Sequence, residues 1–248
     1  MFTERHFLIL GATGGIGAEV ARILRRAGAD VTLVGRDPNR LATLAEELNA
    51  RQQTADCRSI GEVDKCVGDA ADEFGRLDGV VNCVGSILLK PAHLTTSEEW
   101  QETLATNLTS AFATVRAGCR AMSKNGGSIV LIASAAATVG LPNHEAIAAA
   151  KAGIVGLMRS AAASYAGRGI RVNAVAPGLV QTPLTERIWN RPQSEQTSRS
   201  MHPIGRLGTA RDVASLIVWL LDPENDWATG QVFGIDGGLS TLRRDARD

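Results

Sequence analysis

Short, wholly apolar runs alternate with longer amphipathic stretches along almost the whole chain. The apolar runs end at a glycine or a polar side chain, which is typical of strands buried on both faces of a parallel sheet. We predict strands at residues 7–10, 31–34, 52–55, 77–82, 128–133, 170–175 and 231–235. The alternation predicts an α/β fold with a doubly wound parallel sheet of about seven strands and helices on both faces.

Helices are predicted between these strands, and two further segments have a different character. The helical stretches are residues 18–27, 38–49, 60–74, 97–122, 145–165 and 213–221. Residues 181–208 have mixed polarity and several turn signals, and residues 241–248 form a charged tail without a packing signal. Because no linker, repeat or low-complexity segment interrupts the pattern, we expect residues 1–248 to form one domain.

Charge and composition narrow the class of ligand. The chain has 26 Lys and Arg and 26 Asp and Glu, so no net field favours nucleic acid or an anionic membrane, and a small-molecule ligand fits better. The apolar run before Gly11 is too short for a signal segment or a membrane span. The cysteines are far apart and form no metal-binding pair, which indicates free thiols, no metal site and a cytoplasmic protein. They are Cys57, Cys66, Cys83 and Cys119.

A glycine-rich loop follows the first predicted strand. It opens the first predicted helix and reads Gly11-Ala12-Thr13-Gly14-Gly15-Ile16-Gly17. Glycine lets the backbone turn tightly and approach a pyrophosphate, while the helix N-terminus supplies N–H donors and partial positive charge. An ordinary tight turn is the alternative for such a loop taken alone. The loop predicts a Rossmann-type dinucleotide site that includes Gly11, Thr13, Gly15, Ile16 and Gly17.

The end of the second predicted strand bears on the choice of dinucleotide. NAD enzymes place Asp or Glu there for the ribose 2′-OH, whereas a nearby Arg accommodates the 2′-phosphate of NADP. Here the end reads Gly35-Arg36, and the guanidinium of Arg36 is a planar fork suited to phosphate. Asp37 follows at once and offsets part of that charge, and a solvated loop position is the alternative for Arg36. We predict NADP(H) in preference to NAD(H).

Two later segments connect the loop to a known family. Ser134 lies seventeen positions before Lys151, and the strand at 170–175 is followed by Pro177-Gly178-Leu179-Val180-Gln181-Thr182. With the glycine loop, these segments resemble the short-chain dehydrogenase/reductases, in particular the 3-oxoacyl-carrier-protein reductases, over about residues 6–240. In that family a Tyr stands thirteen positions after the Ser and four before the Lys, and it donates the proton. Position 147 of this chain is Ile.

The resemblance implies roles for further residues. Ser134 would fix the substrate oxygen, Lys151 would hold the ribose, and Asn107 would help to hold a water linked to the lysine. A local backbone hydrogen bond is the alternative for Asn107. Residues 181–208 correspond to a mobile substrate lid. The other implied cofactor residues are Asp56 and Cys57 beside the adenine, Asn82 locking neighbouring strands, Gly85 leaving room, and Pro177, Gly178, Val180 and Thr182 at the nicotinamide.

No tyrosine of this chain can take the place of Ile147. The single tyrosine, Tyr165, lies eighteen residues along the same predicted helix, roughly 27 Å away. The enoyl-reductase form of the motif has its Tyr six residues before the Lys, where this chain has Glu145. His144 is the best replacement, because it lies two helical turns before Lys151 and the ordinary histidine pKa of about 6.5 suits proton donation. A helix-start or pocket-wall position is the alternative for His144, and Glu145 is a weaker candidate.

Three functions are compatible with these observations. The first is an NADP(H)-dependent oxidoreductase that interconverts a carbonyl and an alcohol with an atypical proton donor, which the retention of Ser134, Lys151 and Asn107 favours. The second is a nucleotide-binding pseudoenzyme. In the third, Ile147 shapes the pocket for a substrate that needs no proton from that position. From the resemblance and the small residues of the helix at 146–163, we also expect a homo-oligomer, either a tetramer or a dimer.

Overall fold

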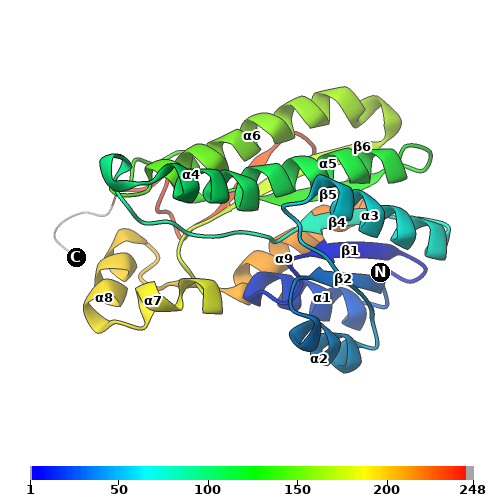
Figure 1. Ribbon diagram of the computed structural model, residues 1–248, viewed down its shortest axis with the longest axis horizontal. Coiled ribbons are helices and arrows are strands. Elements are labelled where there is room, and N and C mark those ends of the chain that lie inside the picture. The colour runs from blue at the N-terminus through cyan, green and yellow to red at the C-terminus, as the bar shows by residue number, and fades with distance from the viewer. Residues whose placement is uncertain (1, 244–248) are drawn as a thin grey trace.

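The computed structural model describes residues 2–243 and contains a seven-stranded parallel sheet (Figure 1). Its strands are β1 (His6–Leu10), β2 (Asp30–Gly35), β3 (Arg51–Thr54), β4 (Gly79–Asn82), β5 (Gly127–Ile132), β6 (Ile170–Pro177) and β9 (Val232–Ile235). They lie in the order β3-β2-β1-β4-β5-β6-β9, and every neighbouring pair is parallel. The predicted fold class is confirmed.

Helices cover both faces of the sheet (Figure 1). On one face lie α1 (Gly15–Arg26), α2 (Pro38–Leu48) and α9 (Ala210–Leu221). On the other lie α3 (Ile60–Phe74), α4 (Ser97–Leu104), α5 (Ser110–Ala121) and α6 (Glu145–Tyr165). Short helical turns are η1 (Ala92–Leu94), η2 (Ala105–Thr109), η3 (Ala135–Ala137), η4 (Ala166–Arg168) and η6 (Pro223–Asn225).

Successive residues of the central strand enter two separate hydrophobic cores. Leu8 and Leu10 of β1 pack in the core beneath α3, α5 and α6. Phe7 and Ile9 pack in the core beneath α1, α2 and α9. Because neighbouring side chains of a strand point to opposite faces, a strand covered on both faces favours apolar residues at successive positions. This arrangement explains the wholly apolar runs of the sequence.

The strand order reverses at β1, which pairs with β2 on one side and with β4 on the other. In open α/β sheets, ligands bind outside the carboxyl ends of the strands at such a reversal. Gly11 follows β1 there and Cys83 follows β4, and the N–H of Cys83 donates to the carbonyl oxygen of Leu10 at 2.9 Å. The fold therefore places the glycine loop at the position where ligands bind in sheets of this kind.

The segment at 181–208 leaves the sheet and forms small elements of its own. These are η5 (Pro183–Thr185), α7 (Glu186–Trp189) and α8 (Pro192–Met201). At its base, β7 (Val180–Gln181) pairs with β8 (Gly208–Thr209), a two-stranded sheet that the sequence pattern did not predict. Helices α7 and α8 lie at one end of the molecule, apart from the main sheet (Figure 1). Of the predicted charged tail, residues 244–248 lie outside the described residues.

Two helices add detail to the sequence prediction. The stretch at 97–122 is divided, because η2 is a π-helical turn between α4 and α5. Helix α6 has the predicted bounds. Together with η4, it is the one helix of the described residues that is long and apolar enough to span a membrane. However, Ile154 and Met158 of α6 are buried in the core against the sheet, as expected of a core helix.

Candidate active site

A cavity of about 400 Å³ opens at the carboxyl ends of β1, β2 and β4. Its wall combines segments that lie far apart in the sequence: the glycine loop, the ends of β2, β3 and β4, and the start of η5. The predicted cofactor residues that it brings together are Gly11, Thr13, Gly15, Arg36, Asp56, Cys57 and Gly85.

Close backbone contacts require glycine at two positions of the loop. Gly11 has a φ of +74°, and a Cβ there would lie 2.8 Å from the carbonyl carbon of Cys83. A Cβ on Gly17 would lie 2.5 Å from the carbonyl oxygen of Gly11. The first turn of α1 therefore packs directly on the loop. Gly14, the N-cap of α1, has no side chain to bond the free N–H groups of that turn, which suits them to an anion.

The segment after β6 reaches the glycine loop through Thr182. A Cβ on Gly15 would lie 2.8 Å from Cγ2 of Thr182, so these two residues are in contact. Pro177 ends β6, and Val180 is buried in β7. Ile16 lies in the first turn of α1 and does not line the cavity. Of the residues predicted at the nicotinamide, Thr182 is thus the one that the structure brings against the loop.

Gly178 has a different neighbour. A Cβ on Gly178 would lie 2.5 Å from Nε2 of His202. The same nitrogen accepts a hydrogen bond from the N–H of Leu179 at 3.1 Å, and His202 is buried. The structure places Gly178 in a second cavity with His202 and Asp236, which is not the one that the glycine loop lines.

Three arginines line the cavity of the glycine loop, and they differ in how far their charges are neutralised. Arg58 forms a salt bridge with Asp56 at 2.5 Å, which holds the pKa of that carboxyl below its usual range. Arg40 donates to the carbonyl oxygen of Thr13 at 2.8 Å. Arg36 is exposed and forms no salt bridge within the described residues. Arg40 and Arg58 were not among the predicted site residues, because Arg40 on α2 and Arg58 after β3 meet Arg36 only in the folded chain.

Asp37 has a structural role that its sequence position does not show. Its carboxylate accepts the backbone N–H groups of Asn39 and Arg40 at 3.0 and 3.1 Å, and so caps the N-terminus of α2. A carboxylate engaged in this way is stabilised by the helix dipole. Asp37 lines the same cavity as Arg36, so its negative charge stays beside the guanidinium.

Lys151, on α6, lies behind the cavity and is not one of the residues that line it. The residue is 6% exposed, and its Nζ donates to the carbonyl oxygen of Ile132 at 2.8 Å. Burial lowers the pKa of Lys151 to about 8. A Cβ on Gly85 would lie 3.7 Å from this Nζ and 3.3 Å from Oδ1 of Asn107. Because Gly85 lines the cavity, the lysine and the asparagine lie directly behind this part of its wall.

Asn107 lies in the π turn η2, which packs against α6. Its Nδ2 donates to Oγ of Ser86 at 3.0 Å and to the carbonyl oxygen of Thr103 at 2.9 Å. Its Oδ1 accepts the N–H of Ser86 at 3.3 Å. The side chain therefore makes both the local bond that was the alternative interpretation and a bond across to the loop after β4. Ser86 is a polar residue of the site that sequence reasoning missed.

The side chain of Asn82 has other hydrogen-bond partners than expected. Its Nδ2 donates to Oγ1 of Thr114 at 2.9 Å and to Oγ of Ser110 at 3.3 Å, both on α5. Its Oδ1 accepts the N–H of Val84. Asn82 thus fixes its own loop to a helix and does not join neighbouring strands, because the side chain leaves the last position of β4 toward the helical layer.

Ser134 and Ile147 lie on two elements that pack together, η3 and α6. Oγ of Ser134 accepts the N–H of Ala136 at 3.2 Å, which leaves its own hydrogen free to donate. Ile147 is 4% exposed. It lies one turn before Lys151, where it can offer only apolar surface.

His144 lies outside the helix on which its predicted role depended. It is the N-cap of α6, with φ −109° and ψ 10°, so it does not continue the helical phase of Lys151. Its Nδ1 donates to the carbonyl oxygen of Pro142 at 2.8 Å. The side chain is half-buried, and Glu145 beside it is exposed.

The segment at 181–208 contacts the site loop through Arg187. The guanidinium of Arg187, on α7, donates to the carbonyl oxygen of Ile87. Nε1 of Trp189 donates to the carbonyl oxygen of Thr182 at 3.2 Å. These two bonds connect α7 to both sides of the site. They join residues up to a hundred positions apart, so no local sequence signal could have revealed them.

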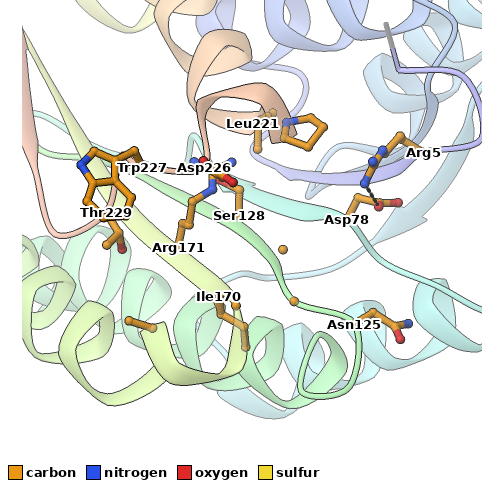
Figure 2. Close-up of a pocket in the computed structure, with 15 residues that line it drawn as sticks. Arg5, Asp78, Asn125, Ser128, Ile170, Arg171, Leu221, Asp226, Trp227 and Thr229 are labelled. Carbon is orange, nitrogen blue, oxygen red and sulfur yellow. Dashed lines mark hydrogen bonds and ion pairs between the residues drawn. The ribbon is translucent and has the colours of Figure 1, made fainter.

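A third cavity, of about 660 Å³, lies at the opposite end of the sheet from the glycine loop, at the amino ends of β5 and β6 (Figure 2). Arg5 and Asp78 form a salt bridge at 2.9 Å on its wall. Arg171 donates to the carbonyl oxygens of Leu220 and Asp222 at 2.8 and 3.1 Å. This cavity contains none of the predicted site residues.

Comparisons with known proteins agree with this geometry. The fold and the loop together define a dinucleotide-binding α/β protein. A family model described as enoyl-(acyl carrier protein) reductase matches residues 11–240. The chain is 34% identical to the short-chain dehydrogenase/reductase aba4 of Botryotinia fuckeliana strain B05.10, over 96% of this chain and 97% of that protein. The chain belongs to the short-chain dehydrogenase/reductase family.

Two further relatives have more specific names. The 3-oxoacyl-acyl-carrier-protein reductase of Thermotoga maritima is 34% identical, over 94% of this chain and 96% of that protein. The solved structure of a variant of actinorhodin polyketide ketoreductase with NADPH has a TM-score of 0.90 and 30% identity. It covers 98% of this chain, and the whole of that chain is matched.

Proposed function

We propose that this protein is an NADP(H)-dependent oxidoreductase that interconverts a carbonyl and an alcohol by hydride transfer. The observation that carries the proposal is the placement of buried Lys151 and Asn107 directly behind Gly85, which lines the same cavity as the glycine loop. Relatives named as a 3-oxoacyl reductase and as a ketoreductase with NADPH support the same reaction class.

The residues present fit a dinucleotide. Glycine at positions 11 and 17 lets the loop pack closely on the segment after β4 and on the first turn of α1, because a Cβ at either position would meet protein backbone, and that turn offers uncapped N–H groups to a pyrophosphate. Asp56 and Cys57 line the far part of the same cavity, where the adenine would lie. When bound, the nicotinamide supplies or accepts the hydride. Lys151 would bond the adjacent ribose, and the hydroxyl of Ser134 would donate a hydrogen bond to the substrate oxygen.

A preference for NADP(H) is supported by the free charge at the end of β2. Arg36 has no salt-bridge partner within the described residues, and Arg40 uses one of its donors on the carbonyl of Thr13. Asp37 is engaged as the cap of α2. Two guanidinium groups therefore face a position where a 2′-phosphate would be the counter-charge.

Ile147 would occupy the place of the proton-donating tyrosine of the family. The absence of this tyrosine removes general acid catalysis worth about 10² to 10⁴ in rate and leaves the dinucleotide contacts untouched. A nucleotide-binding pseudoenzyme is the second candidate, and the buried, apolar Ile147 is the observation that favours it. A substrate that needs no proton at this position is the third.

The test separates binding from turnover. The purified protein is titrated with NADPH and NADH, and NADPH oxidation is then followed against ketones and 3-oxoacyl thioesters. We expect tighter binding of NADPH and slow but measurable turnover that tracks protein concentration. Binding without turnover of any compound would favour the pseudoenzyme, and a protein that binds neither dinucleotide would contradict the whole proposal. Lys124→Arg, an exchange on the exposed surface, is the matched control.

We further propose a homo-oligomer and a cytoplasmic location. A groove between α5 and α6 supports the first, because exposed Phe112 and the open positions at Gly156 lie along this face. The four free cysteines support the second. Light scattering that gave a monomer at micromolar concentration would contradict the oligomer.

A further inference from the structure

Lys151 has an unusual environment for a charged side chain. It is 6% exposed, and its one hydrogen-bond acceptor within the described residues is the uncharged carbonyl of Ile132. The one ionisable group of the described chain that influences it is the thiol of Cys83, whose own pKa burial raises to about 12. At pH 7 that thiol is neutral. Lys151 therefore carries a proton that no anion of the described chain holds in place.

The other lysines provide the contrast. The chain has four, all within the described residues. Lys65 pairs with Asp69, and Lys90 pairs with Glu99 at 2.7 Å. Lys124 is exposed to water. Lys151 alone of the four is buried, and it alone lies directly behind the wall of the candidate site.

The remaining candidate donors lack either reach or acidity. Tyr165 lines the groove between α5 and α6, at the other end of α6 from the site. His144 gives its Nδ1 hydrogen to the carbonyl of Pro142 and lies outside the helix. The hydroxyl of Ser134 can donate a hydrogen bond, but a serine hydroxyl is too weak an acid to lose its proton near neutral pH without help.

We propose that the ammonium group of Lys151 is the general acid of this site, in the role that the tyrosine has elsewhere in the family. The inference rests on the proposed function. In the reductive direction, a bound reduced nicotinamide dinucleotide would supply the hydride for the new C–H bond and be oxidised by two electrons, while the carbonyl π electrons would move to oxygen. That oxygen would take one proton through a water molecule from Lys151, which would become a neutral amine. Lys151 would then recover a proton from solvent.

Geometry and burial both suit this role. The Nζ lies 3.7 Å from the position of a Cβ on Gly85, a residue that lines the cavity, so the ammonium group lies directly behind the cavity wall and a water molecule would carry its proton to the ligand. With a pKa of about 8, Lys151 is protonated at pH 7 and yet a stronger acid than a solvated lysine. A donor whose pKa lies near the working pH transfers its proton most efficiently. Ile147, one turn before Lys151, is buried and offers it no anion.

The first test needs neither cofactor nor substrate. Nuclear magnetic resonance of the protein labelled at its lysine side chains gives four signals, because the chain has four lysines. The signal that is lost in Lys151→Arg identifies Lys151. We expect its midpoint near pH 8, well below the ordinary lysine pKa of 10.5. A midpoint at or above 10.5 would overturn the inference.

The second test is kinetic. Wild-type kcat for carbonyl reduction should be level below pH 7 and fall as the pH rises through 8, because the acid form is then lost. Arginine keeps the positive charge but cannot give up a proton. Lys151→Arg should therefore lower kcat by about 10²-fold or more while the Kd for NADPH changes much less. Lys124→Arg is the matched control and should leave both unchanged.

The outcomes separate this inference from the proposed function. Full turnover in Lys151→Arg, or a fall in kcat that follows His144→Ala in its place, would overturn the inference and leave the proposed function standing. A wild type that binds NADPH but reduces no carbonyl would overturn both.

Discussion

The two ends of the sheet offer different surroundings to a ligand. The cavity at the amino ends of the strands is the larger, at about 660 Å³ against about 400 Å³ at the carboxyl ends. Most of its charged groups already have protein partners: Asp78 is bound by Arg5 and Arg76, and Arg171 by backbone carbonyls, whereas Asp226 is exposed and has no partner within the described residues. At the carboxyl ends, Arg36 and the first turn of α1 keep their hydrogen-bonding capacity free.

The difference shows that free bonding capacity, and not volume, marks the candidate site. Burial acts against the charge of Asp78, yet hydrogen bonds from Arg76, the N–H of His6 and Arg5 outweigh it and hold its pKa below the usual range. The carboxylate of Asp78 is therefore held by hydrogen bonds within the protein. Lys151, at the other end of the sheet, is buried with one uncharged partner. Burial lowers its pKa and so favours the neutral amine. A buried group whose charge is not compensated is a candidate for chemistry.

The largest effect is expected from Ile147→Tyr. A phenol one turn before Lys151 would place a proton donor beside Ser134, and the rate of ketone reduction should rise by about 10² to 10⁴. The measurement is NADPH oxidation at saturating substrate. Ile147→Phe is the control, because it adds the ring without the hydroxyl. An equal gain in both variants would show that pocket shape, and not proton donation, limits the wild type.

The next effect concerns the stability that the buried charge removes. The folded pKa of Lys151, about 8, lies below the ordinary lysine value of 10.5, so between these values the unfolded chain binds more protons and folding becomes more favourable as pH rises. Relative to Lys151→Met, the wild type should gain on the order of 3 kcal/mol of unfolding free energy between pH 7 and 10.5. Urea unfolding at both pH values measures this. A difference that does not change with pH would contradict the lowered pKa.

A smaller change is expected at the mouth of the same cavity. Arg36→Ala should weaken NADPH binding by about 1.5 to 3 kcal/mol, the range for a hydrogen bond to a charged group, and leave NADH binding nearly unchanged. Arg40→Ala should show the same selectivity with a smaller loss, because one of its donors is already used on Thr13. Calorimetric titration of both dinucleotides gives the values. Equal losses for NADPH and NADH would remove the argument for phosphate recognition.

The smallest effect should come from the larger cavity. Trp227 lies at its rim and is 98% exposed (Figure 2). Trp227→Ala should change the free energy of unfolding by less than about 0.5 kcal/mol, as for most surface substitutions, and leave the Kd for NADPH unaltered. A marked loss of dinucleotide affinity in this variant would break the distinction between the two ends.

The sequence predicted those parts of the molecule that depend on local pattern. The strands, helix α6 and the glycine loop follow from apolar spacing and from glycine chemistry within a few residues. The capping bonds of Asp37, next to Arg36, were not predicted, because they exist only once α2 is formed. The neighbour of Gly178 could not be foreseen, since His202 lies more than twenty residues away.

Polar partners between elements were the least predictable part of the site. Asn82 was expected to join strands and instead bonds Ser110 and Thr114, because the register of α5 over β4 decides what its amide meets. Ser86 lacked any motif, and its contact with Asn107 spans 21 positions. Such pairs are fixed by packing, which a single sequence does not encode in any local signal.

The π turn that carries Asn107 also sets the rotational phase of the long helix around it. Side chains advance by about 100° per residue in an α-helix, and a π turn holds one residue more than an α turn does. That extra residue lets α4 bury Thr103 while α5 directs Ser110 and Thr114 toward Asn82. Deleting one residue from Ala105–Thr109 would make the helix regular and rotate one half against the other by about 100°. The sheet would keep its core, but Asn107 would turn away from Ser86, so a single deletion here would alter the candidate site and leave the sheet folded.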